Sequence, residues 1–257
     1  MTLEERADYL IRYLLDEREE YQGIALPSGL EEKRRLLRSL MNVRPPAPVS
    51  EAFLDVQGAY LEERLAERGI TSLNDLTPVR PGLYLWQGDI TTLAVDAIVN
   101  AANSRMLGCF VPCHSCIDNA IHTYAGMQLR LECARIMEKQ GGAEPAGKAK
   151  ITKAYHLPCR YVLHTVGPII DGEVTQAERD MLASCYRSCL NLAAANELHS
   201  VAFCCVSTGE YHFPNTMAAE IAIETVEAWR KQNKEPIEVV FNVFKDCDYA
   251  IYKRLLQ

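Results

Sequence analysis

The chain has 257 residues, of which 48% are hydrophobic and 24% charged, and its formal net charge at pH 7 is −7. This composition is typical of a folded globular protein, and the acidic balance argues against a general nucleic-acid-binding surface, although a pocket for one nucleotide needs little net charge. No apolar run reaches the roughly 18 residues that a membrane-spanning helix requires. The acidic N-terminus lacks the basic start of a secretion signal, and ten cysteines without such a signal indicate a reducing compartment, by default the cytoplasm.

Residues 1–80 are predicted to form a helical extension in front of a second domain at 81–257. Helices this short need a surface to pack on, so we expect them to dock on the following domain as a stabilising cap rather than to bind a partner. The first helix is predicted from apolar residues that recur at helical spacing, namely Leu3, Leu10, Ile11, Leu14 and Leu15.

Local signals predict the ends of two further helices in this extension. Ser28 and Glu31 fit a capping box at the start of the second helix, and the proline pair that follows it should end it. Ser50 is expected to cap a third helix that extends through Glu67, with Gly69 well placed to terminate it.

From about Leu83 the pattern changes to alternating strands and helices. This alternation predicts an α/β fold with a mixed, mostly parallel central sheet that is flanked by helices on both faces. The expected strands are 83–87, 97–100, 149–156, 161–165, 201–206 and 238–244. The expected helices are 117–139, 175–196, 215–231 and 246–256.

Four short segments fall in loops at strand ends, where such folds bind ligands: residues 87–91, 100–103, 107–118 and 207–214. Asp89 follows a glycine and can accept a hydrogen bond from an exocyclic amine such as that of adenine. Asn103 offers an amide that can hold vicinal hydroxyls. The backbone amides from Ser207 to Gly209 can cradle a phosphate in front of a helix. For each loop taken alone, an ordinary turn remains the alternative.

The third of these loops contains three soft metal ligands within eight residues, Cys109, His114 and Cys116, and an acidic residue, Asp118, follows. Thiolates and imidazole bind Zn²⁺, and a site with three protein ligands leaves one position for water or substrate. Cys113 is a spare thiol that would crowd a tetrahedron because it adjoins His114. A structural zinc site or a loop of buried thiols is the alternative to an open zinc site.

Taken together, the four segments resemble the macrodomain family, which binds ADP-ribose, over about residues 83–255. The resemblance includes the stretches 147–158 and 161–168, and within the family the chain looks like the MacroD-type hydrolases. Where those proteins carry a run of glycines, this chain has Cys109 to Cys116. That replacement is similar to zinc-dependent macrodomains of microbial sirtuin-linked operons, which also carry a helical N-terminal extension.

The resemblance implies a role for each matching residue. Asp89 and Ile90 belong to the adenine end. Asn103, Ile117 and Asp118 lie near the distal ribose, and Asn103 and Asp118 are the implied catalytic residues. The zinc ligands are Cys109, His114 and Cys116. The phosphate-binding loop comprises Ser207, Thr208, Gly209, Glu210 and Tyr211. Many MacroD-type proteins have a small or apolar residue in place of Glu210, so its carboxylate beside a diphosphate needs a partner.

The implied activity is removal of mono-ADP-ribose from modified proteins, and in some organisms the modified protein is a relative of the lipoyl carriers. Hydrolysis needs a water at the anomeric carbon of the distal ribose. Either the zinc or Asp118 can activate that water, and we expect zinc to orient and activate it while Asn103 and Asp118 hold ribose and water. The alternative function is a reader that binds ADP-ribose without cleavage and uses zinc structurally.

Overall fold

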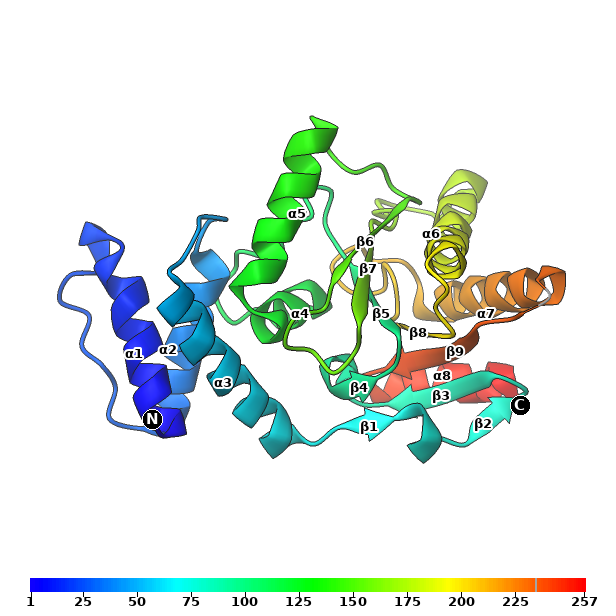
Figure 1. The fold of residues 1–257 in the computed structure, drawn as a ribbon. Helices are drawn as coiled ribbons and strands as arrows, with labels where there is room; N and C mark the ends of the chain where they lie inside the picture. The colour runs from blue at the N-terminus through cyan, green and yellow to red at the C-terminus, as the bar shows by residue number, and fades with distance from the viewer. Residues whose placement is uncertain (234) are drawn as a thin grey trace.

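The computed structural model describes residues 1–233 and 235–257 (Figure 1). Its main sheet has seven strands in the order β2-β3-β9-β8-β5-β7-β6. Strands β3, β9, β8, β5 and β7 run parallel, whereas β2 and β6 are antiparallel to their neighbours at the two edges. In sequence order the strands are β1 (Thr71–Ser72), β2 (Pro78–Arg80), β3 (Leu83–Gln87), β4 (Leu93–Ala94), β5 (Ala97–Ala101), β6 (Ala149–Lys153), β7 (Tyr161–Thr165), β8 (Ser200–Phe203) and β9 (Glu238–Val243).

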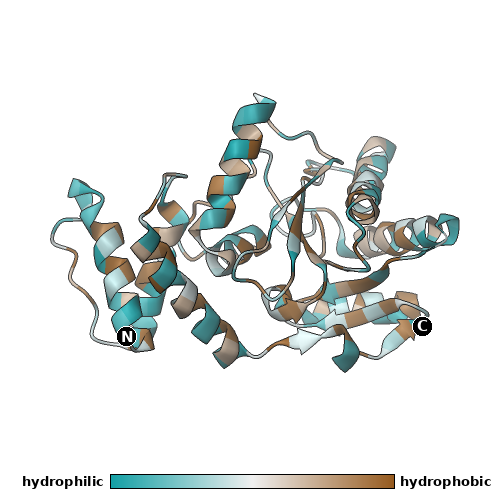
Figure 2. Cartoon of the chain, viewed as in Figure 1, coloured by the Kyte–Doolittle hydropathy of each residue, from teal (hydrophilic) through white to brown (hydrophobic). Residues whose placement is uncertain are grey.

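Helices cover both faces of this sheet, which confirms the predicted fold class (Figure 1). Apolar residues concentrate in the strands, while the outer turns of the helices are hydrophilic (Figure 2). This distribution is expected for parallel strands that are buried on both faces. The α-helices are α1 (Leu3–Asp16), α2 (Leu30–Val43), α3 (Glu51–Arg68), α4 (Ile117–Ala125), α5 (Met127–Gln140), α6 (Gln176–Ala195), α7 (Asn215–Gln232) and α8 (Asp246–Leu256).

The strongest periodic segments agree with the sequence predictions. Strands β3 and β7 and helix α8 have the predicted bounds, β5, β9 and α7 differ from them by one residue at one end, and α6 is one residue shorter at each end. Two strands are shorter than predicted: β6 ends at Lys153 instead of residue 156, and β8 ends at Phe203 instead of residue 206. The residues that follow β8 turn into the cavity described below.

The prediction of one helix over 117–139 is wrong in one respect, because this segment forms two helices, α4 and α5. Gly126 has φ +90°, a backbone conformation that ends α4 and starts α5. A side chain at this position would lie 2.6 Å from Gln57 Nε2, so the break also makes room for a contact with α3. A glycine inside an apolar periodic pattern does not by itself reveal such a break.

The three N-terminal helices pack around their own apolar core, at the side of the molecule next to α4 and α5 (Figure 1). Met127 of α5 joins this core, and its amide donates to Gln57 Oε1 at 2.9 Å. Each buried aliphatic or aromatic side chain contributes roughly 1.5–3 kcal/mol to such packing. The cap of α3 is as predicted, since Ser50 Oγ accepts from Phe53 N at 3.2 Å and Gly69, with φ +80°, ends the helix.

Two details of this extension correct the sequence analysis. The predicted capping box at Ser28 and Glu31 is wrong: Gly29 is the N-cap of α2, and because glycine has no side chain only half of such a box forms, in which the Gly29 amide donates to Glu32 Oε2 at 3.3 Å. Residues 70–80 contain no α-helix: β1 pairs with β4, a single 3-10 turn covers Leu73–Asp75, and β2 joins the main sheet through β3. Strands of two or three residues are too short to produce a periodic pattern. Within the described residues, no helix is long and apolar enough to cross a bilayer.

Candidate functional site

A cavity of about 840 Å³ lies where the parallel strands end. Its lining follows β3 at Gly88, β5 at Ala102, β8 at Cys204 and β9 at Phe244. Carboxyl ends of parallel strands meet at one edge of a sheet, which is why loops far apart in sequence share this space. All thirteen residues predicted for the adenine end, the ribose end, the phosphate loop and the metal line the cavity.

Asp118 lies at the base of this cavity and is only 5% exposed. Its Oδ1 accepts from Asn100 Nδ2 at 2.8 Å and its Oδ2 from Asn103 Nδ2 at 3.1 Å. Burial raises the pKa of the carboxyl to about 6, while the two amide donors and the Arg130 charge limit the rise. The carboxylate is therefore held in one orientation by two amides, with its remaining lone pairs free to accept from water or a hydroxyl.

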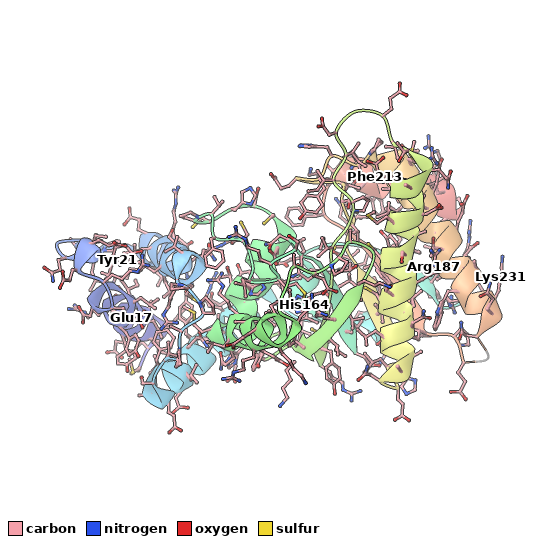
Figure 3. All side chains as sticks on the ribbon, turned by 90° about the horizontal axis from the view of Figure 1, so that it is seen from above. Glu17, Tyr21, His164, Arg187, Phe213 and Lys231 are labelled. Atoms are coloured by element: carbon pink, nitrogen blue, oxygen red, sulfur yellow. The ribbon has the colours of Figure 1, made fainter. Side chains whose placement is uncertain are left out.

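A buried polar layer under Asp118 was not assigned from the sequence. Asn100 Nδ2 also lies 3.1 Å from His164 Nδ1, and His164 Nε2 lies 2.9 Å from Thr152 Oγ1. His122 Nε2 lies 3.6 Å from Asp118 Oδ1. Figure 3 labels His164 in the interior of the molecule. A sequence signal exists for Asn100 and His164, which are polar residues in the buried strands β5 and β7.

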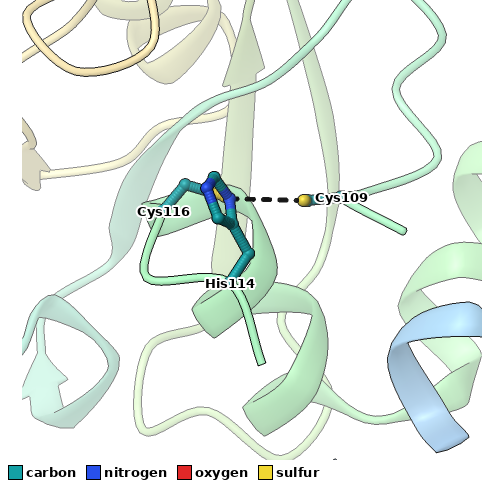
Figure 4. Close-up of side chains that lie close together, drawn as sticks. All are labelled: Cys109, His114 and Cys116. Atoms are coloured by element: carbon teal, nitrogen blue, oxygen red, sulfur yellow. Dashed lines mark hydrogen bonds between the residues drawn. The ribbon is translucent and has the colours of Figure 1, made fainter. Parts of the chain in front are cut away.

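The loop between β5 and α4 brings three predicted metal ligands together. Cys109, His114 and Cys116 offer ligand atoms that lie within 4.8 Å of one another. Cys109 Sγ and His114 Nδ1 are 3.5 Å apart (Figure 4). A tetrahedral zinc site with ordinary Zn–S and Zn–N bonds would separate such atoms by about 3.6 Å. Donor type and spacing therefore fit Zn²⁺.

Cys113 lies on the other side of this loop. Its Sγ is 3.2 Å from Ser39 Oγ and 3.4 Å from the carbonyl of Arg35, both on α2. The residue has φ +52°, a conformation that turns the chain between Cys109 and His114. The Cys113 thiol therefore faces α2, and its exclusion from the ligand set stays a prediction.

The loop after β8 forms a tight turn. Ser207 has φ +65°, and Phe213 N donates to its carbonyl at 3.0 Å, which closes the turn. In the described part of the chain, the amides of Gly209, Glu210 and Tyr211 have no backbone or side-chain acceptor. Such free amides in a tight turn are suited to bind an anion. Gly167 permits the loop to approach closely, because a Cβ there would lie 1.9 Å from Ser207 Oγ.

Glu210 points from this turn toward the Cys/His loop. Its side chain is 69% exposed, and its Oε1 lies 3.6 Å from His114 Nε2. This is the ring nitrogen opposite to the one that faces Cys109. The acidic side chain thus lies beside an imidazole nitrogen, and exposure to water reduces the cost of its charge.

Asp89, which also lines the cavity, is held by contacts with Thr91 and Arg68. Its Oδ1 accepts from Thr91 N at 3.0 Å and from Thr91 Oγ1 at 2.6 Å, and its Oδ2 lies 3.0 Å from Arg68 Nη1. Arg68 belongs to α3 and stacks 3.6 Å from the ring centre of Tyr124. The sequence did not predict this pairing because the two residues lie in different predicted domains.

Comparison with known proteins defines the class. The chain belongs to the macrodomain family: a profile described as Macro domain matches residues 99–222. The protein-ADP-ribose hydrolase of Treponema medium is 56% identical over 260 residues, which is 100% of both chains. The protein-ADP-ribose hydrolase of Staphylococcus aureus (strain MSSA476) is 51% identical over 250 residues, 96% of this chain and 94% of that one.

Solved structures agree with this assignment. The Trypanosoma brucei macrodomain in complex with ADP-ribose has a TM-score of 0.67 and 34% identity, over 86% of this chain and 95% of that one. The Oceanobacillus iheyensis macrodomain with MES bound has a TM-score of 0.62 and 36% identity, over 68% of this chain and 89% of that one. The predicted family is therefore confirmed, whereas the sirtuin-linked subfamily and the zinc stay predictions.

Proposed function

We propose that this protein is a zinc-dependent hydrolase that removes mono-ADP-ribose from modified proteins. The names of its relatives support ADP-ribose removal, and the structural neighbour that binds ADP-ribose supports the ligand. The observation that carries the proposal is the convergence of three soft metal ligands, a buried carboxylate and a free-amide turn on one cavity. A reader would need the cavity but not an open metal position beside an acid.

In this proposal the ligand extends along the cavity. Asp89 and Ile90 contact the adenine, and the amides between Ser207 and Tyr211 bind the diphosphate. The distal ribose reaches Asn103, Ile117 and Asp118. A volume of about 840 Å³ is within the range of pockets that enclose ligands larger than a single nucleotide.

The reaction adds water across the bond between the anomeric carbon and the acceptor atom. The water oxygen binds the carbon, the acceptor atom leaves with a proton, and free ADP-ribose is released. Zn²⁺ held by Cys109, His114 and Cys116 would supply Lewis acidity and orientation for water or ribose hydroxyls. Asp118, fixed by Asn100 and Asn103, accepts hydrogen bonds from water and ribose and is basic enough to take a proton near neutral pH.

The same proposal assigns a role to Glu210. A metal-bound histidine usually donates its second N–H to a carboxylate or carbonyl, which fixes its tautomer. The Glu210 carboxylate lies on that side of the His114 ring. We therefore assign it to orientation of His114 rather than to contact with the diphosphate.

The test measures the rate of ADP-ribose release and the affinity for free ADP-ribose separately. Asn103→Ala and Asp118→Ala should lower single-turnover release of ADP-ribose from a mono-ADP-ribosylated protein, by at least ~100-fold for Asp118 if it is the base. Affinity for free ADP-ribose, measured by calorimetry, should change much less because the adenine and diphosphate contacts remain. Asp180→Ala, at an exposed position of α6, is the control and should match the wild type.

Outcomes that contradict the proposal are specific. Wild-type protein that is zinc-loaded and binds ADP-ribose, yet releases none from Asp-, Glu-, Ser- or Arg-linked substrates, would support a reader instead. The partner is a modified protein in either case, and a lipoyl-carrier relative stays a prediction. The cytoplasmic location and the domain boundary at residue 80 also stay predictions.

A further inference from the structure

Helix α2 of the N-terminal extension contacts the Cys/His loop through a half-buried arginine, Arg38. Arg38 Nη2 donates to the carbonyl of His114 at 3.0 Å and to Asn119 Oδ1 at 2.7 Å, and its Nε donates to the same oxygen at 3.2 Å. The partners lie 76 and 81 residues away in sequence. Arg38 also lines the ligand cavity.

Asn119 transmits this contact to the rest of the loop. The residue is fully buried at the start of α4, and its Nδ2 donates to the carbonyl of Val111 at 3.0 Å. Its backbone amide points at Cys116 Sγ, 3.4 Å away. Through its side chain and its backbone amide, one residue thus connects the guanidinium on α2 with both arms of the loop that holds Cys109, His114 and Cys116.

A second side chain of α2 fixes the middle of the same loop. Asn42 is buried, its Oδ1 accepts from Cys113 N at 2.9 Å, and its Nδ2 donates to Thr123 Oγ1 at 3.0 Å. These contacts hold Cys113 in its left-handed conformation between the ligand residues. The loop therefore depends on α2 at its centre as well as at His114.

The macrodomain in turn holds the end of α2. Arg130 of α5 donates from one nitrogen, Nη1, to the carbonyls of Met41, Asn42 and Arg44 at 3.0, 2.9 and 2.6 Å. A cation at the C-terminal carbonyls of a helix is electrostatically favourable. The guanidinium carbon also lies 4.4 Å from the ring centre of Phe110, a loop residue. In Figure 1, α2 lies beside α4 accordingly.

We propose that Arg38 is a positioning residue of the candidate active site, so that the N-terminal extension is part of the hydrolytic architecture and not only a stabilising cap. The forked guanidinium of Arg38 fixes the His114 carbonyl and Asn119. Through these two groups it fixes the spacing of the ligand atoms of the Cys/His loop. Only the kinetic part of this inference rests on the proposed function, because loop order and metal retention can be measured without any reaction.

The test compares substitutions on one helix in the full chain. Arg38→Met removes the fork, Arg38→Lys keeps the charge but cannot bond both acceptors in the same way, and Arg35→Met changes an exposed arginine of the same helix as a control. Hydrogen exchange at amides 109–119 should be at least ~10-fold faster in both Arg38 variants, and zinc transfer to a chelator should be about 10-fold faster. Affinity for free ADP-ribose should stay within about 3-fold of the wild type, because the adenine and diphosphate contacts are elsewhere.

Single-turnover release of ADP-ribose should fall about 10-fold in the Arg38 variants and stay unchanged in Arg35→Met. If wild-type protein shows no release, the proposed function fails, while the exchange and zinc measurements still decide the role of Arg38. If Arg38→Met does not fold, Arg38→Lys is the variant that is compared with Arg35→Met. Loop exchange and zinc retention in the folded Arg38 variants equal to those of Arg35→Met would overturn the proposal.

Discussion

Asp89 combines a proposed binding role with an internal pairing, and the pairing follows from its position after β3. Thr91 and Arg68 fix the carboxylate, so an adenine amine can meet an acceptor that is already oriented. Preorganisation of this kind reduces the entropy lost on binding. The price is that substitution of Asp89 also leaves Arg68 without its partner.

Asp89→Ala should therefore weaken affinity for free ADP-ribose by ~1–3 kcal/mol, the cost of a lost charged hydrogen bond. Calorimetry measures this directly, with thermal unfolding as the control for the lost Arg68 contact. Arg68→Met removes the same ion pair but keeps the carboxylate, so its affinity loss should be smaller. Unchanged affinity in a folded Asp89→Ala protein would exclude Asp89 from the binding site.

Cys109 and Cys113 of the Cys/His loop point in different directions. Cys109→Ala should abolish stoichiometric zinc, whereas Cys113→Ala should retain about one Zn per chain, because Cys113 Sγ faces Ser39 on α2 and not His114. Metal analysis of protein purified without chelator gives the answer. Loss of zinc in Cys113→Ala with retention in Cys109→Ala would make the assigned ligand set wrong.

At the scale of elements, the sequence predicts those helices and strands whose bounds depend on the local pattern of apolar residues. β3 and β7 are short segments rich in apolar and aromatic residues, and α8 has periodic apolar positions, so their bounds emerge from a few adjacent residues. The three ligand-type residues lie within one short loop, which is why their proximity is also predictable. The strands β1, β2 and β4 are missed because pairing between distant segments, and not local pattern, defines them.

The same limit explains which site residues the sequence does not reveal. Asn100 is a polar residue in a buried strand, and its partner Asp118 becomes visible only when β5 and α4 are placed side by side. Arg38 and Arg68 lie in a segment whose helical pattern predicts packing but not which loop it packs against. Contacts between elements far apart in sequence have no periodic signal.

At the scale of the whole molecule, the extension and the macrodomain meet around the cavity. Arg68 of α3 contacts Asp89, and Arg38 of α2 contacts the Cys/His loop. Asp89, Arg38 and this loop line the same cavity. The sheet supplies strand ends that bring the binding loops together, and the extension adds contacts that fix two of them. This arrangement accounts for a helical segment that has no chemistry of its own in the sequence.

The central claim is that a metal held by Cys109, His114 and Cys116 is required for release of ADP-ribose from modified protein. The direct measurement is single-turnover release by one preparation in three states: as purified, after chelation confirmed by metal analysis, and after Zn²⁺ is restored. We expect release to fall at least ~100-fold on chelation and to recover with zinc, since a positioned metal contributes several kcal/mol to the transition state. Full activity in metal-free protein would contradict the claim and assign any zinc at this loop a structural role.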